Sequence, residues 1–264
     1  MRKTSVLFAL IYLGLLGVGA GHAQSEPTGL PRSAEGCPFL FLPQRFPATG
    51  QTTSYAVGDD GAIRAGAPLK HRDNGDGTIT DQNTYLMWEK KDQLAGGLHD
   101  WNNAYPWEGT CSNNSSKVCG SDADCPGTGA CNVSGGGITI FQWVARLNTP
   151  PCFAHHCDWR IPNVRELQSI VNYQVYSPAV GAAFNNNCNT GCTVDGATNT
   201  TECSCTQSAG TSQGYYWSSS TYAPSPIVKP PGSLLAWGVL FGDGDVLSAG
   251  KTDHDYVRAV RCGR

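Results

Sequence analysis

Two segments of the chain carry apolar residues at helical spacing, and each begins with a capping signal. In the first, Thr139 is the candidate N-cap and Gln142 lies three residues later, as in a capping box, and Pro150-Pro151 ends the segment. In the second, Asn163 and Glu166 take the same relative positions. We expect both helices to bury their apolar stripes, which are Ile140, Trp143, Val144 and Leu147, and Val164, Leu167, Ile170 and Val171.

Strand and turn signals surround these helices. The Asn-Gly and Asp-Gly pairs within 72–78 predict a tight hairpin turn, with strand residues at 79–80 and 84–88 after it. The turn is acidic but lacks the spacing of an EF-hand loop, so a plain hairpin is favoured over a calcium site. Further strands are predicted at 215–221, 236–241, 246–247 and 256–261, with Trp237, Val239 and Phe241 on one face.

Two segments with few apolar residues look inserted into this pattern. They run from about 109 to 137 and from about 185 to 213, and both are rich in Cys, Gly, Ser, Asn and Thr. Each is too long for an ordinary loop, so we expect disulfides to hold it in shape. A Pro-rich lead-in at 24–48 precedes them, and the predicted domain spans 49–264.

The N-terminus resembles a secretory signal peptide. Arg2 and Lys3 precede an apolar run at 6–20, and small residues before Gln24 form a plausible cleavage site. The run is shorter than the roughly 20 residues that span a bilayer, which favours a cleaved signal at 1–23 over an uncleaved anchor. The mature chain is therefore predicted to be extracytoplasmic (periplasmic, on the cell surface or secreted), without a membrane span.

The cysteine content agrees with an oxidising compartment, where an even number of cysteines indicates disulfides. Short loops favour a Cys152–Cys157 bridge and closure within 111–131, and the rest of the connectivity stays open. Zinc binding by the 152–157 segment, which adds His155 and His156, is an alternative that its close spacing disfavours. We predict no metal and no cofactor. The disulfide candidates are Cys37, Cys111, Cys119, Cys125, Cys131, Cys152, Cys157, Cys188, Cys192, Cys203, Cys205 and Cys262.

Composition and motifs exclude several function classes. The chain has 18 Lys and Arg against 21 Asp and Glu, without the basic patch that nucleic-acid binding needs. A G-x-S-x-G match at 210–214 lacks the strand before and the helix after that a nucleophile elbow requires. There is no H-E-x-x-H, phosphate-binding loop or dinucleotide fingerprint. The sequence therefore predicts a protein that is not an enzyme.

The aromatic residues are too numerous to assign entirely to core faces. Aromatic rings beside Asp, Asn and Arg suit sugar recognition, because a ring face packs on sugar C–H groups while polar groups bind hydroxyls. Packing within the core remains the simpler explanation for any single ring. The rings in question are Trp88, Trp101, Trp107, Trp217, Trp237, Tyr222 and Tyr256.

Several strings together resemble the Lcl C-terminal domain family, a bacterial family whose members mostly lack a known function. The strings lie at 47–61, 73–88, 158–170, 216–221, 237–244 and 257–261. The resemblance implies a C-type-lectin-like α+β fold, with two helices, a small twisted antiparallel sheet and long loops stapled by disulfides. It also implies adhesion through polysaccharides.

This chain departs from the family's namesake and from related folds. It has no collagen-like repeat, and it lacks the Glu-Pro-Asn, Gln-Pro-Asp and Trp-Asn-Asp motifs of calcium-dependent lectins. A related fold also houses formylglycine-generating oxidases, which use a reactive cysteine pair. Here Cys262 is the only cysteine after Cys205, and a disulfide is its plainer role.

We therefore expect a secreted, non-catalytic module that binds an extracellular glycan or another extracellular ligand. The alternatives are a structural or assembly protein that binds a cell-envelope protein and, less favoured, an enzyme on the same fold. A ligand site is predicted near the closing strands, although Arg258 fits a structural ion pair equally well. The candidate residues are Trp237, Asp243, Asp245, Tyr256 and Arg258.

Overall fold

The computed structural model describes residues 45–194, 203–208, 214–223 and 234–263. The predicted signal peptide, Cys37 and most of the G-x-S-x-G match lie outside these residues. Within them, no helix is long and apolar enough to cross a membrane.

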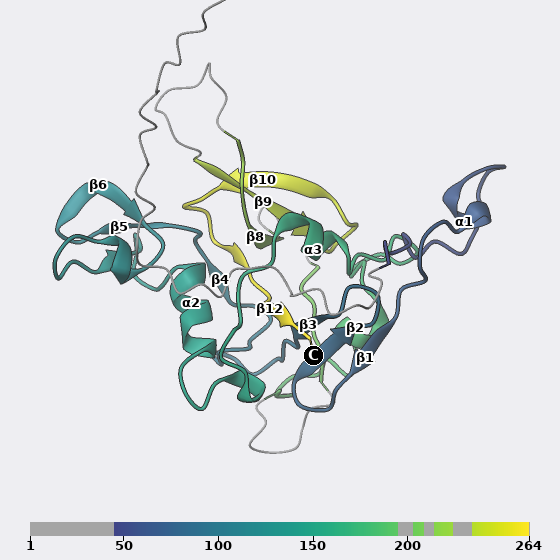
Figure 1. Ribbon diagram of the computed structural model, residues 1–264, viewed down its shortest axis with the longest axis horizontal. Helices are drawn as coiled ribbons and strands as arrows, with labels where there is room; N and C mark the ends of the chain where they lie inside the picture. Colours follow the sequence, from purple (N-terminus) through teal and green to yellow (C-terminus); the bar gives the residue numbers. More distant parts are fainter. Residues whose placement is uncertain (1–44, 195–202, 209–213, 224–233, 264) are drawn as a thin grey trace, which may run out of the picture. The chain divides into compact units, whose positions relative to one another are not determined.

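The described chain forms three β-sheets (Figure 1). The four-stranded sheet has the order β1 (His71–Asp73), β2 (Thr78–Asp81), β3 (Leu86–Glu89) and β12 (Val260–Cys262). The five-stranded sheet has the order β10 (Val246–Gly250), β9 (Leu235–Leu240), β8 (Tyr215–Thr221), β11 (Asp255–Tyr256) and β4 (Ala104–Tyr105). The small third sheet has the order β6 (Asn114–Cys119), β5 (Gly109–Cys111) and β7 (Cys131–Asn132). All pairs are antiparallel except β11 with β8.

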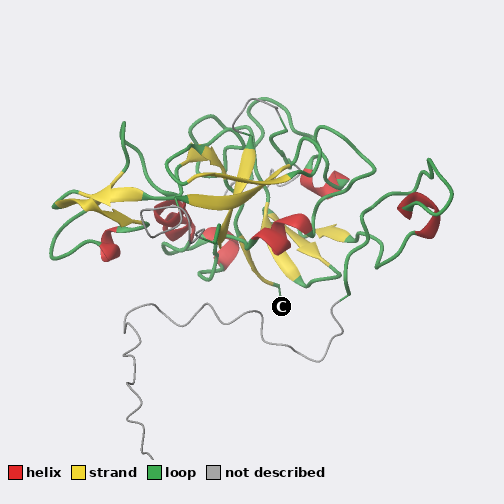
Figure 2. Ribbon diagram, turned by 90° about the horizontal axis from the view of Figure 1, so that it is seen from above, coloured by secondary structure: helices red, strands yellow, loops and turns green. Residues whose placement is uncertain are grey.

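The expected two-helix, C-type-lectin-like α+β fold is wrong, because the described chain is mostly β with twelve strands and only three short α-helices (Figure 2). Many strands have only two to four residues, too few to show a period of two in the sequence. The helices are α1 (Asp60–Ile63), α2 (Ile140–Leu147) and α3 (Val164–Gln168), with 3₁₀ turns at Asp122–Asp124, Phe153–His155 and Ala182–Phe184.

The two predicted helices themselves are confirmed as α2 and α3. Thr139 caps α2 and Asn163 caps α3, and each makes the reciprocal capping box with the residue three positions later. The apolar stripes face the core, with Trp143 and Leu167 fully buried. Local signals therefore located both helices, although the helices contribute little to the fold class.

The core lies where α3 and the two larger sheets meet. Leu167 of α3 packs in one cluster with Trp88 of β3, Tyr216 of β8, Val239 of β9 and Val260 of β12. A second cluster forms around α2 and includes Trp143. Figure 1 shows α3 beside β8 and β9 of the five-stranded sheet.

The predicted final strand at 256–261 is divided between two sheets. Residues 255–256 pair with β8 and β4, whereas 260–262 pair with β3. Residues 257–259 carry the chain from one sheet to the other, and we call them the crossover. The turn at 72–78 connects β1 and β2 as the predicted hairpin.

Every described cysteine is disulfide-bonded. The bridges are Cys111–Cys125, Cys119–Cys131, Cys152–Cys157, Cys188–Cys205 and Cys192–Cys203, and Cys262 is bonded as well. The expected Cys152–Cys157 bridge and the closure within 111–131 are confirmed. The disulfides indicate an oxidising, extracytoplasmic environment.

Candidate functional site

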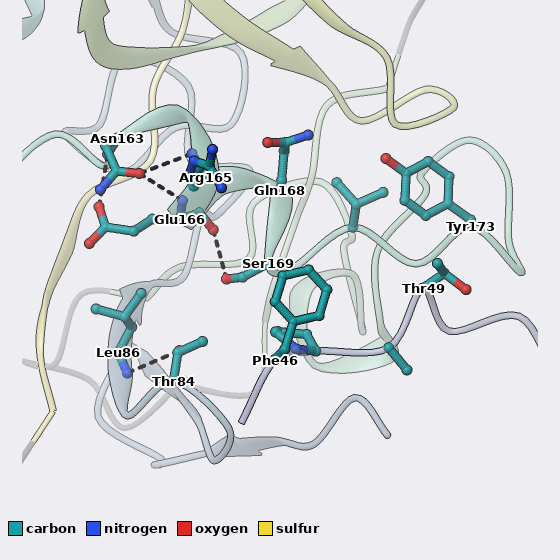
Figure 3. Close-up of a pocket in the computed structure, with 13 residues that line it drawn as sticks. Phe46, Thr49, Thr84, Leu86, Asn163, Arg165, Glu166, Gln168, Ser169 and Tyr173 are labelled. Carbon is teal, nitrogen blue, oxygen red and sulfur yellow. Dashed lines mark hydrogen bonds between the residues drawn. The ribbon is translucent and has the colours of Figure 1, made fainter. Parts of the chain in front are cut away.

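A pocket of about 730 Å³ opens beside α3 (Figure 3). Its walls come from three parts of the chain: the segment at 46–49, the start of β3 and the stretch from α3 to Tyr173. We call it the α3 pocket. It is lined by Phe46, Pro47, Ala48, Thr49, Thr84, Leu86, Asn163, Arg165, Glu166, Gln168, Ser169, Val171 and Tyr173.

The α3 wall combines one neutralised carboxylate with two unengaged polar side chains. Both oxygens of Glu166 accept hydrogen bonds from the Arg160 guanidinium, at 2.6 and 2.7 Å, and one also accepts from the Asn163 N–H. Within the described residues, the exposed side chains of Arg165 and Gln168 form no hydrogen bond or ion pair. The only unpaired charge lining the pocket, among described residues, is therefore the Arg165 guanidinium.

The wall at 46–49 is held by backbone and side-chain hydrogen bonds to the segment after α3. The Tyr173 N–H donates to the Thr49 carbonyl at 2.9 Å. The Gln174 Oε1 accepts from the N–H groups of Thr52 and Thr53, at 2.6 and 2.8 Å. Gly50 has φ +87°, and a Cβ there would lie 2.3 Å from Asn172 Oδ1. Only glycine suits this close approach.

Two aromatic rings add apolar surface that is still accessible to solvent. The Phe46 side chain is 85% exposed and Tyr173 is 43% exposed. The Tyr173 hydroxyl donates to the Gly244 carbonyl at 3.3 Å. Partial burial is the main cause that raises the pKa of Tyr173, and the negative charges of Asp245 and Asp243 raise it further. The phenol therefore stays protonated at neutral pH.

Two of the residues predicted from the sequence lie near this pocket. Asp243 and Asp245 are exposed in the turn between β9 and β10, where Asp243 Oδ1 accepts the N–H of Asp245. Gly244 between them approaches Val171 and Tyr173 closely enough that a Cβ would lie 2.7 Å from each. The turn therefore packs against the pocket wall, although neither carboxylate lines the pocket.

Two other predicted residues lie elsewhere on the five-stranded sheet. Trp237 is half-buried in β9, with its ring centroid 5.1 Å from that of Tyr222. Tyr256 is half-buried in β11, with its ring centroid 5.7 Å from that of Tyr216. Strand β8 separates β9 from β11, and neither Trp237 nor Tyr256 lines the α3 pocket.

The fifth predicted residue, Arg258, is fully buried in the crossover. Its guanidinium donates to the carbonyls of Glu89 and Cys205, at 2.9 and 2.7 Å, and to the Thr206 hydroxyl at 2.9 Å. Its Nε–H is buried without a partner. The side chain thus satisfies carbonyls where the chain changes sheets, and it has no surface for a ligand.

A buried charge network adjoins Arg258. Glu89 accepts from Lys91 Nζ at 3.1 Å, contacts His99 Nδ1 at 2.7 Å and accepts the Ala259 N–H at 2.9 Å. Burial favours the neutral acid, but the charges and hydrogen bonds of Lys91 and His99 hold the pKa of Glu89 below its usual value. Glu89 therefore stays ionised inside the fold.

The groups with metal-ligand chemistry in the described residues are two sets of three cysteines. Each set brings its sulfurs within 4.8 Å of one another. All of these sulfurs are already in disulfides, which also applies to Cys152 and Cys157 of the alternative zinc segment.

A comparison with known protein families identifies the family of this chain. The sequence model of the Lcl C-terminal domain family matches residues 77–261, which is more than half of the chain. The chain belongs to the Lcl C-terminal domain family. Neither a search of curated proteins nor a search of solved structures found a match.

The α3 pocket combines family and non-family segments. The Lcl C-terminal domain match contains β3 and α3 but begins after Phe46 and Thr49. The sequence predicted a Pro-rich lead-in at 24–48 and a core helix at α3, and neither pattern indicated a pocket between them. The polar residues Arg165 and Gln168, three positions apart on the outer side of α3, were a signal that could have pointed to the pocket.

Proposed function

We propose that this Lcl C-terminal domain protein is an extracytoplasmic, non-catalytic binding module that holds a carboxylate-bearing oligosaccharide in the α3 pocket. The observation that carries the proposal is the unpaired Arg165 guanidinium at the pocket, beside a Glu166 that Arg160 already neutralises. A free guanidinium binds a carboxylate through two parallel hydrogen bonds.

The remaining lining supplies the other half of sugar recognition. The exposed rings of Phe46 and Tyr173 offer apolar faces for sugar C–H groups. The Gln168 amide offers both a donor and an acceptor for hydroxyls. An apolar pocket with a few convergent polar groups is the usual form of a small-ligand site.

A glycan array tests this proposal on oxidatively folded mature protein. It compares uronic-acid oligosaccharides with neutral ones, for the wild-type chain and for Arg165→Ala. The matched control is Arg146→Ala, because Arg146 is also an exposed helical arginine but lies on α2. We expect the wild type and the control to bind acidic glycans and Arg165→Ala to lose at least about tenfold in affinity, the size of one charge-assisted hydrogen-bond pair.

Equal binding by Arg165→Ala and the wild type would contradict the proposed site. Binding of neutral glycans only would contradict the proposed ligand class. Repeating the array with EDTA tests the carboxylates of Asp243 and Asp245 as metal ligands, and binding through Arg165 should survive EDTA.

A protein partner in the cell envelope is the second candidate function, and one observation favours it. Large apolar side chains are exposed along 46–63 and 173–176, the two segments that contribute Phe46 and Tyr173 to the pocket. They are Phe46, Tyr55, Val57, Ile63, Tyr173, Val175 and Tyr176. Where such side chains form a continuous surface, that surface commonly marks an interaction site.

This alternative is tested by co-purification from envelope extract. Tyr55→Ser should abolish capture of a protein partner and leave glycan binding intact. Leu247→Ser serves as the control, since Leu247 is also exposed but lies on β10.

A further inference from the structure

Two disulfides of the second cysteine-rich insert lie in contact with each other. Cys205 Sγ lies 3.7 Å from Cys203 Sγ and 4.0 Å from Cys192 Sγ, although Cys205 is bonded to Cys188 and Cys203 to Cys192. We call these four residues the sulfur cluster. At these distances Cys205 Sγ is in van der Waals contact with the neighbouring disulfide and lies beside its S–S bond.

The sulfur cluster has an accessible side and a buried side. Cys188 and Cys192 are half-buried, whereas Cys203 and Cys205 are almost completely buried. Each disulfide therefore joins one sulfur that an external thiolate can reach to one that it cannot. Attack at the outer sulfur releases the inner sulfur as the leaving group.

The backbone of one inner cysteine, Cys205, contacts a buried cation. The Arg258 guanidinium donates to the Cys205 carbonyl, and its Nε–H is buried without a partner. A neighbouring guanidinium stabilises a thiolate over a thiol. A thiolate on Cys205 would thus form in a residue whose carbonyl binds the Arg258 guanidinium, with its sulfur in contact with the second disulfide.

We propose that the sulfur cluster is a thiol–disulfide exchange centre whose co-reactant is a small external thiolate. The thiolate attacks Cys188 Sγ, which forms a mixed disulfide and leaves the electron pair on Cys205. The Cys205 thiolate attacks Cys192 Sγ, which forms Cys192–Cys205 and leaves the electron pair on Cys203. The Cys203 thiolate then attacks Cys188, which forms Cys188–Cys203 and returns the external thiolate.

This sequence of steps balances without an oxidant or a reductant. Two protein disulfides exist before and after, and the thiolate is regenerated. Attack on Cys192 rather than Cys203 avoids a bond between two residues with a single residue between them, which disulfide geometry disfavours.

The other disulfides lack one or more of these features. The four cysteines Cys111, Cys119, Cys125 and Cys131 also form one cluster, but all four are buried, so neither of their disulfides has an accessible outer sulfur. Cys157 is exposed, but the Cys152–Cys157 bridge has no neighbouring disulfide sulfur within the described cysteine groups. The cysteines within 111–131 therefore serve as a control for the effect of burial. The Cys152–Cys157 bridge serves as a control for the effect of contact between two disulfides.

The test uses the oxidatively folded full mature chain with about one-tenth of an equivalent of glutathione at mildly alkaline pH, where the thiolate is populated. Acid quenching, alkylation and peptide mass spectrometry then identify the disulfide pairs. We expect Cys188–Cys203 and Cys192–Cys205 to accumulate to roughly a tenth of the protein or more, while the other pairs stay unchanged. A Cys152→Ser/Cys157→Ser variant should re-pair at the wild-type rate.

Three outcomes would overturn the proposal. The first is glutathione bound to Cys188 or Cys192 without any re-pairing. The second is re-pairing that occurs first within 111–131. The third is a Cys203–Cys205 bond in place of Cys192–Cys205.

Discussion

The α3 pocket and the crossover at 257–259 each present one arginine, and the surroundings of the two side chains are opposite. Arg165 is exposed and has no hydrogen bond or ion pair within the described residues. Arg258 is fully buried and donates to two carbonyls and a hydroxyl. An arginine that is already bonded holds the fold, whereas an unbonded one is available to a ligand.

The largest effect that we expect is on stability, and it comes from substitution of Arg258 in the crossover. Arg258→Met should lower the free energy of unfolding by about 3–5 kcal/mol, because it leaves the carbonyls of Glu89 and Cys205 buried without donors. Urea titration followed by tryptophan fluorescence measures this. A loss below about 1 kcal/mol would mean that Arg258 is not a structural residue.

A second prediction concerns Asp255 in β11, next to the crossover. Burial raises its pKa from 3.8 to about 6, and its Oδ2 has no partner. The folded state therefore keeps a proton that the unfolded chain loses, so stability falls as the pH rises from about 4 to about 6. Asp255→Asn should stabilise the protein by about 1–3 kcal/mol at pH 8.

The same variant should show no gain at about pH 3.5, where Asp255 is protonated in both folded and unfolded chains. Asparagine keeps an oxygen for the Tyr215 N–H, which Asp255 Oδ1 accepts at 3.3 Å. Thermal melts at the two pH values measure the difference. An equal gain at both would show that charge is not its cause.

The third prediction concerns a substitution that disturbs the wall of the α3 pocket and leaves Arg165 unchanged. Gly50→Ala combines a positive φ with a close approach to Asn172, so it should release the 46–53 segment from Tyr173 and Gln174. Hydrogen exchange at Thr52 and Thr53 should accelerate, and affinity for acidic glycans should fall by about tenfold. Gly58→Ala is the control, since Gly58 also has positive φ but nothing within 4 Å of its Cβ position.

The smallest expected effect is on glycan binding by Trp237→Ala. Because Trp237 does not line the α3 pocket, the affinity for acidic glycans should change by less than about twofold. The same array measures it. A loss as large as that of Arg165→Ala would move the binding site to β9, where the sequence first suggested it.

The sequence predicted what depends on local signals. The capping boxes at Thr139 and Asn163 located both helices, and the Asn-Gly and Asp-Gly pairs located the β1–β2 turn. The Cys152–Cys157 bridge followed from its short loop. In each case, residues within a few positions of one another determine the structure.

Long-range contacts could not be predicted in this way. Strand β4 pairs with β11 about 150 residues away, and two-residue strands have no pattern of their own. The α3 pocket depends on Thr49 contacting Tyr173. The burial of Arg258 depends on the carbonyls of Glu89 and Cys205, which no spacing around position 258 reveals.

The most direct test of the central claim couples the charge of Arg165 to the charge of the sugar. Calorimetric titration compares a uronic-acid oligosaccharide that binds on the array with its carboxyl-reduced form, for the wild type and Arg165→Ala. We predict that carboxyl reduction weakens binding to the wild type by about tenfold or more and has almost no effect on Arg165→Ala. An equal loss for both proteins would show that the carboxylate does not bind Arg165, and would contradict the proposed site.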